Sequence, residues 1–192
     1  GEIDGYVRQS FTDQSGSNTQ FGLSFPIIKD QLAIRVSGLY DTNEASDAEN
    51  VTLDKGVENE TRAFRAVLLW EPADNFDLRL SYHDIEDEFD IDPVVEGNGL
   101  AFDDRTAVAD FDSRMEGETD YLILESNYTF SNDWTLSFVA SDQDNRIPRY
   151  WDGDASEVQA RSQFVDSNVY DTQVYELRLA SQGNEFWDWT AG

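Results

Sequence analysis

Four short polar turns divide this chain, and aromatic or aliphatic residues that favour strands flank each of them. The connections between the resulting hairpins are long and acidic. Tight turns at one end of a meander and long loops at the other are typical of a transmembrane β-barrel, in which the two rims face different compartments. The four turns are the segments 25–32, 70–76, 130–134 and 181–186.

A period-two alternation of apolar and polar residues identifies the strands, and it is clearest in the segment 76–83. The longer predicted strands have about ten residues, close to the length that a tilted strand needs to cross a bilayer. We therefore predict an all-β fold: an antiparallel up-and-down meander that forms a partial transmembrane β-barrel of about nine strands, with short periplasmic turns and long acidic extracellular loops. The predicted strands are 3–11, 19–28, 32–40, 61–71, 76–83, 120–130, 134–141, 174–181 and a last one from 186 onward.

The same alternation assigns side chains to faces, because a shift of one residue would exchange the two faces of a strand. Aromatic residues gather at both ends of the predicted strands, as in the girdles of a membrane barrel. The alternative is that they cap the core of a sandwich. The residues predicted to face lipid or another apolar phase are Ile34, Val36, Leu78, Leu80, Leu136 and Phe138. The residues predicted to face a polar interior are Arg35, Arg79, Ser81 and Ser137.

The net charge is −27, from 40 acidic and 13 basic residues, and it would repel the phosphate backbone of a nucleic acid. Nucleic-acid binding is therefore excluded as a function. The segments 41–60, 84–120 and 142–173 hold 28 of the acidic residues, which predicts that the charge belongs to loops and that the strands are nearly neutral. The chain has no cysteine, so disulfide bridges, thiol nucleophiles and cysteine-based metal sites are excluded too.

Charged residues on the polar strand faces are candidates for a hydrated wall, since an arginine that faced lipid at the bilayer centre would cost roughly 2–4 kcal/mol. The alternative role is cross-strand ion pairing on a wet sheet face. His83 is the single histidine, which leaves no multi-histidine zinc site, and we predict no catalytic residue and no enzyme. The wall candidates are Arg35, Arg65, Arg79, His83, Glu125, Glu176 and Arg178.

Carboxylates are concentrated in the segment 84–92, and a further pair lies in the segment 152–154. Oxygen-rich clusters suit Ca²⁺, which takes about six to eight oxygen ligands, so Asp87, Asp90 and Asp92 are weak candidates for binding it. Neither segment has the spacing of an EF-hand loop, and acidic runs are usually solvated. We therefore predict no specific metal site.

The segment 146–151 is basic and aromatic within acidic surroundings. Arginine and aromatic side chains can stack on a sugar ring or a planar ligand and can contact a carboxylate. The alternative is a hydrophobic anchor that folds a long loop onto its neighbours. The predicted ligand contacts in an external loop are Arg146, Arg149, Tyr150 and Trp151.

Three segments, 25–38, 65–72 and 175–181, resemble the early barrel strands of TonB-dependent outer-membrane receptors. In that family a proline and a turn aspartate precede a strand that contains Leu-Ala-Ile-Arg, and a later Glu-Leu-Arg-Leu strand opens a hairpin. The resemblance covers nearly all of the chain. It implies that residues 1–192 are the N-terminal portion of one barrel domain, without the plug domain, the energy-coupling box and the final aromatic strand of a barrel of about 22 strands.

The resemblance also implies a function, which is uptake of a scarce nutrient across the outer membrane of a Gram-negative type of cell. The nutrient would be an iron chelate, a cobalamin-like compound or an oligosaccharide. Implied partners are outer-membrane lipid, the plug and remaining barrel strands, and an inner-membrane energy-coupling protein reached through the missing N-terminal part. No cofactor is expected. The alternative is a soluble acidic extracellular β-sandwich that binds carbohydrate or calcium, and dependence on detergent would separate the two.

Overall fold

The computed structural model describes residues 2–13, 15–91, 95–96, 106–153, 156–158, 164–182 and 186–192. All strands of these residues belong to one sheet. In the same part of the chain, no helix is long and apolar enough to cross a membrane.

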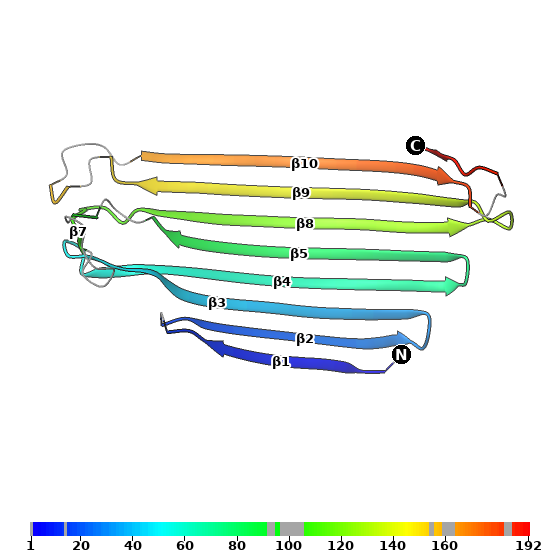
Figure 1. The fold of residues 1–192 in the computed structure, drawn as a ribbon, viewed down its shortest axis with the longest axis horizontal. Helices are drawn as coiled ribbons and strands as arrows, with labels where there is room; N and C mark the ends of the chain where they lie inside the picture. The colour runs from blue at the N-terminus through cyan, green and yellow to red at the C-terminus, as the bar shows by residue number, and fades with distance from the viewer. Residues whose placement is uncertain are drawn as a thin grey trace.

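The sheet is an antiparallel meander in which successive long strands lie side by side (Figure 1). Its order is β1-β2-β3-β4-β5-β8-β9-β10-β11, and the short strands β6 and β7 lie in the connection between β5 and β8. The predicted all-β meander is thereby confirmed. The strands are β1 Asp4–Phe11, β2 Ser17–Ile28, β3 Leu32–Asn50, β4 Lys55–Ala73, β5 Phe76–Asp90, β6 Val95–Glu96, β7 Thr106–Ala107, β8 Arg114–Thr129, β9 Thr135–Trp151, β10 Phe164–Ala180 and β11 Thr190–Ala191.

The short turns lie together at one end of the sheet, the short-turn end, and the other connections lie at the opposite, long-loop end (Figure 1). Asp30 and Asp133 adopt φ angles of 57° and 64° in two of the short turns. Aspartate tolerates this left-handed conformation because its short side chain forms local hydrogen bonds. The predicted arrangement of turns is confirmed for the described residues, and the predicted turn at Gly183 lies outside them.

The strands extend much further toward the long-loop end than predicted. β3 continues beyond Tyr40 to Asn50, β5 beyond His83 to Asp90, and β9 beyond Ser141. The prediction that the acidic charge belongs to loops is therefore wrong, because much of it lies on strands. The apolar alternation fades there since both faces are polar, whereas pairing with neighbouring strands still satisfies the backbone. The last predicted strand, from 186 onward, is reduced to β11.

No second layer covers the described sheet, so the sandwich alternative is wrong. Among the described residues, β1 pairs only with β2, and β10 pairs with β11 over two residue pairs. In the described part of the chain the sheet therefore has two largely open edges, which isolated sheets avoid because open edges recruit other strands. The buried hydrophobic residues of the described part all lie at the long-loop end, and they are Ala48, Val57, Ala107 and Ala109.

This buried group forms a hairpin-tip cluster, in which β7 is tied to the end of β3. β7 pairs in parallel with Glu49 and Asn50. The Asn50 side chain accepts hydrogen bonds from the backbone N–H groups of Thr52 at 3.1 Å and Ala109 at 3.4 Å, and it donates to the Ala109 carbonyl at 3.2 Å. The buried amide is thus satisfied by both segments and holds them together.

Candidate functional site

Side chains of directly paired residues point to the same side of an antiparallel sheet, so the register divides the strands into two faces. Leu80 pairs with Leu68 and Leu124, which defines the apolar face. Arg79 pairs with Leu69 and Glu125, which defines the polar face. The division predicted from the sequence is confirmed, since the six apolar residues lie on the apolar face and the four polar ones on the polar face.

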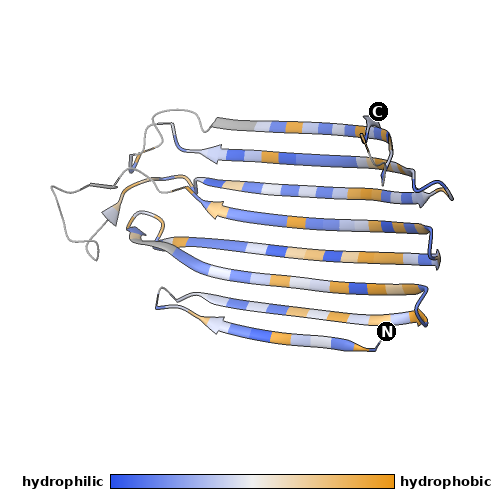
Figure 2. Ribbon diagram, turned by 45° about the vertical axis from the view of Figure 1, so that its right-hand side comes forward, coloured by the Kyte–Doolittle hydropathy of each residue, from blue (hydrophilic) through white to orange (hydrophobic). Residues whose placement is uncertain are grey.

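The apolar face carries an apolar band near the short-turn end, and Figure 2 shows hydrophobic residues concentrated toward this end of β3 and β4. The band consists, on each strand, of the uncharged residues of this face from the short-turn end up to the first charged one. Two of its rows are Phe25, Ile34, Leu68, Leu80, Leu124, Ala140, Tyr175 and Trp70, Leu78, Ser126, Phe138, Leu177. Several members stay exposed in the described sheet, including Leu122 at 46% and Leu177 at 58%. Such an exposed apolar surface indicates an interaction with an apolar phase or partner.

Beyond the band, the apolar face becomes acidic toward the long-loop end. Four aspartates on four successive strands lie opposite one another, and the rows after them contain Glu86 with Glu118 and Glu88 with Glu116. We call these the acidic rows. Like charges directly opposite each other are destabilising unless solvent or counterions screen them, so these rows indicate a wet environment. The four aspartates are Asp84, Asp120, Asp144 and Asp171.

The border between the apolar band and the acidic rows runs diagonally across the strands. Phe64 on β4 is the last band residue there, but its partner on β5 is Asp84. Leu122 is the last on β8, and its partner on β9 is Asp142. From β4 to β9 the border thus drops two rows, about 14 Å, over three strand spacings, also about 14 Å. The border is therefore inclined by roughly 45° to the rows, which run perpendicular to the strands.

All seven predicted wall residues lie on the polar face. Arg79 Nε lies 3.8 Å from Glu125 Oε2, and Arg178 Nη2 donates to Glu176 Oε1 at 2.6 Å. The His83 ring packs edge-to-face against the Tyr121 ring, with 6.0 Å between the ring centroids. The two ion pairs are exposed, and such pairs are worth under about 1 kcal/mol each.

The polar face also carries many neutral amides and hydroxyls toward the long-loop end. Asn145 Nδ2 donates to Thr119 Oγ1 at 2.7 Å, and Asn18 Nδ2 donates to Asp41 Oδ1 at 2.6 Å. The two faces therefore differ in charge at this end, and the excess acid lies on the apolar face.

The predicted ligand contacts of the segment 146–151 do not come together. They lie on β9 and not in a loop, so alternate residues point to opposite faces. Arg146 and Tyr150 lie on the apolar face, where the Arg114 guanidinium sits 4.5 Å from the Tyr150 ring. Arg149 and Trp151 lie on the polar face. The segment expected to be a loop is therefore a strand, and each of its faces carries two of the four residues.

The calcium candidates are also separated. Asp87 lies on the polar face and accepts a hydrogen bond from Thr61 Oγ1 at 2.7 Å, whereas Asp90 lies on the apolar face. Asp92 and Asp154 lie outside the described residues. Among the described side chains, no group of three or more histidine, aspartate or glutamate residues could hold a metal ion.

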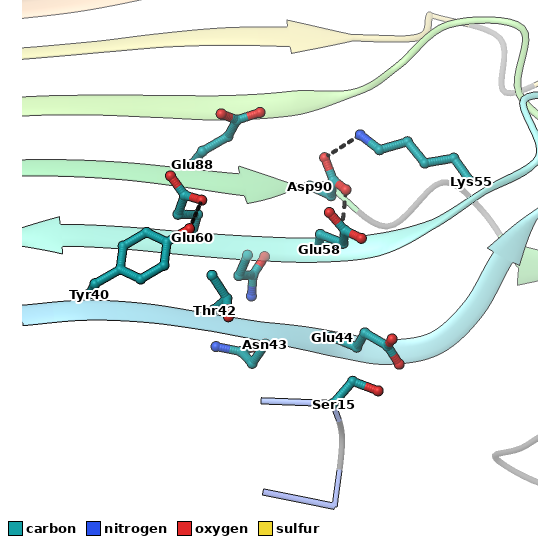
Figure 3. Close-up of a pocket in the computed structure, with 11 residues that line it drawn as sticks. Ser15, Tyr40, Thr42, Asn43, Glu44, Lys55, Glu58, Glu60, Glu88 and Asp90 are labelled. Carbon is teal, nitrogen blue, oxygen red and sulfur yellow. Dashed lines mark hydrogen bonds and ion pairs between the residues drawn. The ribbon is translucent and has the colours of Figure 1, made fainter. Parts of the chain in front are cut away.

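A hollow of about 450 Å³ lies among acidic side chains of β3, β4 and β5 (Figure 3). Tyr40 Oη donates to Glu60 at 2.7 Å, and this hydrogen bond raises the pKa of Tyr40. Lys55 Nζ bridges Asp90 at 3.0 Å and Asp112 at 2.8 Å. The sequence did not indicate this bridge or the hairpin-tip cluster, because both join segments that are far apart in the chain.

No protein-family model and no curated protein sequence matches this chain. Solved structures do match. The chain is similar to the siderophore receptor PirA from Acinetobacter baumannii, with a TM-score of 0.65 and 15% identity, over 97% of this chain and 28% of the receptor.

It is also similar to the ferripyoverdine receptor of the outer membrane of Pseudomonas aeruginosa, whose structure contains ferripyoverdine, with a TM-score of 0.62 and 13% identity over 93% of this chain and 24% of that chain. The FpvAI chain in a complex with pyocin S2 gives the same TM-score and identity. This chain therefore spans about a quarter of the length of these receptors. At this level of identity the likeness establishes a shared fold, and it confirms the expected resemblance to part of such a receptor barrel.

Proposed function

We propose that residues 1–192 form part of the barrel wall of a TonB-dependent type of outer-membrane receptor, with the apolar band toward lipid and the polar face toward the lumen. The diagonal border of the band carries this proposal. In a membrane barrel the strands tilt by about 35–45°, so the edge of the lipid-facing surface must cross them obliquely. The border, inclined by roughly 45°, has this slope, whereas in a sheet with upright strands the border would follow a single row.

The rest of the receptor would supply the plug, the remaining strands and the contact with an inner-membrane energy-coupling protein. The long-loop end would then face outward, and the acidic rows would stand above the membrane on the outer surface of the wall. We propose uptake of a scarce nutrient, of which an iron chelate, a cobalamin-like compound and an oligosaccharide are the candidate classes. Arg149 and Trp151 lie on the polar face at the outer end and are the proposed external ligand contacts.

The absence of cysteine allows a direct test with single-cysteine variants of the full-length receptor, each carrying a nitroxide spin label in a bilayer. The spin label at Leu80→Cys should be relaxed strongly by molecular oxygen, because oxygen concentrates in lipid. Ser81→Cys should instead be relaxed by a water-soluble nickel complex, because it faces the hydrated lumen. Glu86→Cys is the matched control on the same face as Leu80 but above the band, and it should prefer the nickel complex.

Equal oxygen accessibility at Leu80→Cys and Glu86→Cys would overturn the membrane assignment. An apolar band that lipid normally covers should make the receptor associate in buffer without detergent. A receptor that stays monodisperse there would therefore overturn the membrane assignment as well.

A further inference from the structure

The polar face of β3, β4 and β5 carries three arginines, and its three aspartates, Asp41, Asp77 and Asp87, accept hydrogen bonds from other side chains. Arg35, Arg65 and Arg79 lie on three successive strands of this face, and we call them the arginine patch. Arg35 pairs with Val67, and Arg65 pairs with Ser37 one row further on, so these two arginines are diagonal neighbours. Diagonal neighbours are about 7–8 Å apart, within reach of long side chains.

The contacts within the described part of the chain leave most guanidinium donors of the patch free for a further partner. A guanidinium has five N–H donors and no acceptor. Arg35 donates to Ser24 Oγ at 2.6 Å, and Arg79 has a distant ion pair with Glu125 at 3.8 Å. Arg65 Nε is buried and has no hydrogen-bond partner in the described part of the chain. A buried donor without an acceptor is costly, so the arrangement favours an oxygen ligand there.

The location of the acidic charge makes this patch distinct from the rest of the protein. The acidic rows lie on the opposite face and nearer the long-loop end, so the sheet separates them from the patch. The nearest carboxylates on the polar face in the long-loop direction are occupied. Asp41 accepts from Asn18 at 2.6 Å, and Asp87 accepts from Thr61 at 2.7 Å. The patch is therefore locally cationic in a protein with a net charge of −27.

We propose that the arginine patch binds an oxyanion group, a carboxylate or a phosphate, of a ligand that moves along the polar face. Arginine recognises both groups by paired N–H donors in a planar fork. The assignment rests on the proposed function, in which this face lines the lumen. The ligand is therefore expected to be anionic. The net charge of the chain alone would instead favour a cationic ligand.

The test uses the full-length receptor in detergent, with inorganic phosphate and malonate as probes and sodium chloride at matched ionic strength as the reference. A bound anion stabilises the folded state by mass action, so the melting temperature should rise with anion concentration and then saturate. Arg65→Gln should weaken the apparent affinity by about ten-fold or more, because a charge-assisted hydrogen bond is lost. Arg62→Gln is the matched control, since Arg62 lies on the same strand but on the opposite face, and its affinity should equal that of the wild type.

Arg65→Lys should restore part of the affinity, because it returns the charge without the planar fork. If Arg65→Gln does not fold, the exposed Arg35→Gln replaces it with the same expectation. If the wild type and these variants bind the anions with equal affinity, the proposed anion site is refuted. It is also refuted if neither phosphate nor malonate raises the melting temperature. The proposed function fails separately: loss of lipid exposure at Leu80→Cys together with saturable anion binding would overturn the membrane assignment and leave the anion site standing.

Discussion

The hydroxyl of Tyr82 donates a 2.7 Å hydrogen bond to Asp120, and this bond crosses the border between the apolar band and the acidic rows. Tyr82 is the last band residue on β5, and Asp120 is the first acidic residue on β8. A tyrosine with an apolar ring surface and a polar tip suits the boundary between a membrane and water. The two residues therefore mark the level at which the proposed wall leaves the membrane.

Leu80→Arg should destabilise the receptor in a bilayer by about 2–4 kcal/mol, because it places a charge in the middle of the apolar band. The measurement is the free energy of unfolding from phospholipid vesicles by denaturant. Glu86→Arg is the control on the same strand and face, but above the band, and it should change stability by less than about 1 kcal/mol. If Leu80→Arg lowers the free energy of unfolding no more than Glu86→Arg does, the placement of the band is contradicted.

Asp144→Asn should stabilise the protein at low ionic strength by about 0.2–1 kcal/mol, because Asp144 lies between Asp120 and Asp171 in a row of like charges. The gain should disappear near 1 M salt, where the screening length is about 3 Å. Asp133→Asn is the control, since it removes a charge from a short turn in which asparagine also tolerates positive φ. A gain that does not depend on salt would show that charge repulsion is not its cause.

The sequence allowed the meander and its faces to be predicted because apolar and polar residues alternate strictly where one face is apolar. Leu80 and Arg79 were assigned correctly for this reason. The same signal ends where both faces become polar, so the outer half of β9 was interpreted as a loop. Arg146 and Arg149 are therefore expected together in one loop, whereas on the strand their side chains point to opposite faces. The role of Asn50 could not be predicted, since its partner Ala109 is 59 residues away.

Asn50→Ala should loosen the hairpin-tip cluster, because it removes a buried amide that serves both segments. We expect a loss of about 1–3 kcal/mol in the local opening free energy, from unpaired backbone groups of the segment 106–109. Hydrogen exchange of these amides measures it. Asn132→Ala, in an exposed turn at the opposite end, should leave their protection unchanged. Equal protection in the wild type and Asn50→Ala would show that another contact holds the segment.

The bridge from Lys55 to Asp90 and Asp112 should fail at high pH. Burial lowers the pKa of Lys55, but hydrogen bonds to Asp112 and Asp90 outweigh this effect, so the net pKa is raised above its usual 10.5. A raised pKa means that the folded state binds the proton more tightly than the unfolded state. The stabilisation is therefore fully present below the unfolded pKa, and it is lost as pH rises through the folded pKa.

A trifluoromethyl label on a Thr106→Cys variant reports this loss by ¹⁹F NMR, because Thr106 is exposed and its strand β7 pairs with Asn50, which also pairs with Lys55. The signal should change with a midpoint above pH 10.5 in the otherwise wild-type protein. Lys55→Met cannot form the bridge, so it should show the high-pH signal, that of the broken bridge, at every pH. Lys55→Arg should keep the signal of the intact bridge across the whole titration, since a guanidinium stays charged beyond about pH 12. The same midpoint in Lys55→Arg as in the lysine protein would mean that a different group titrates.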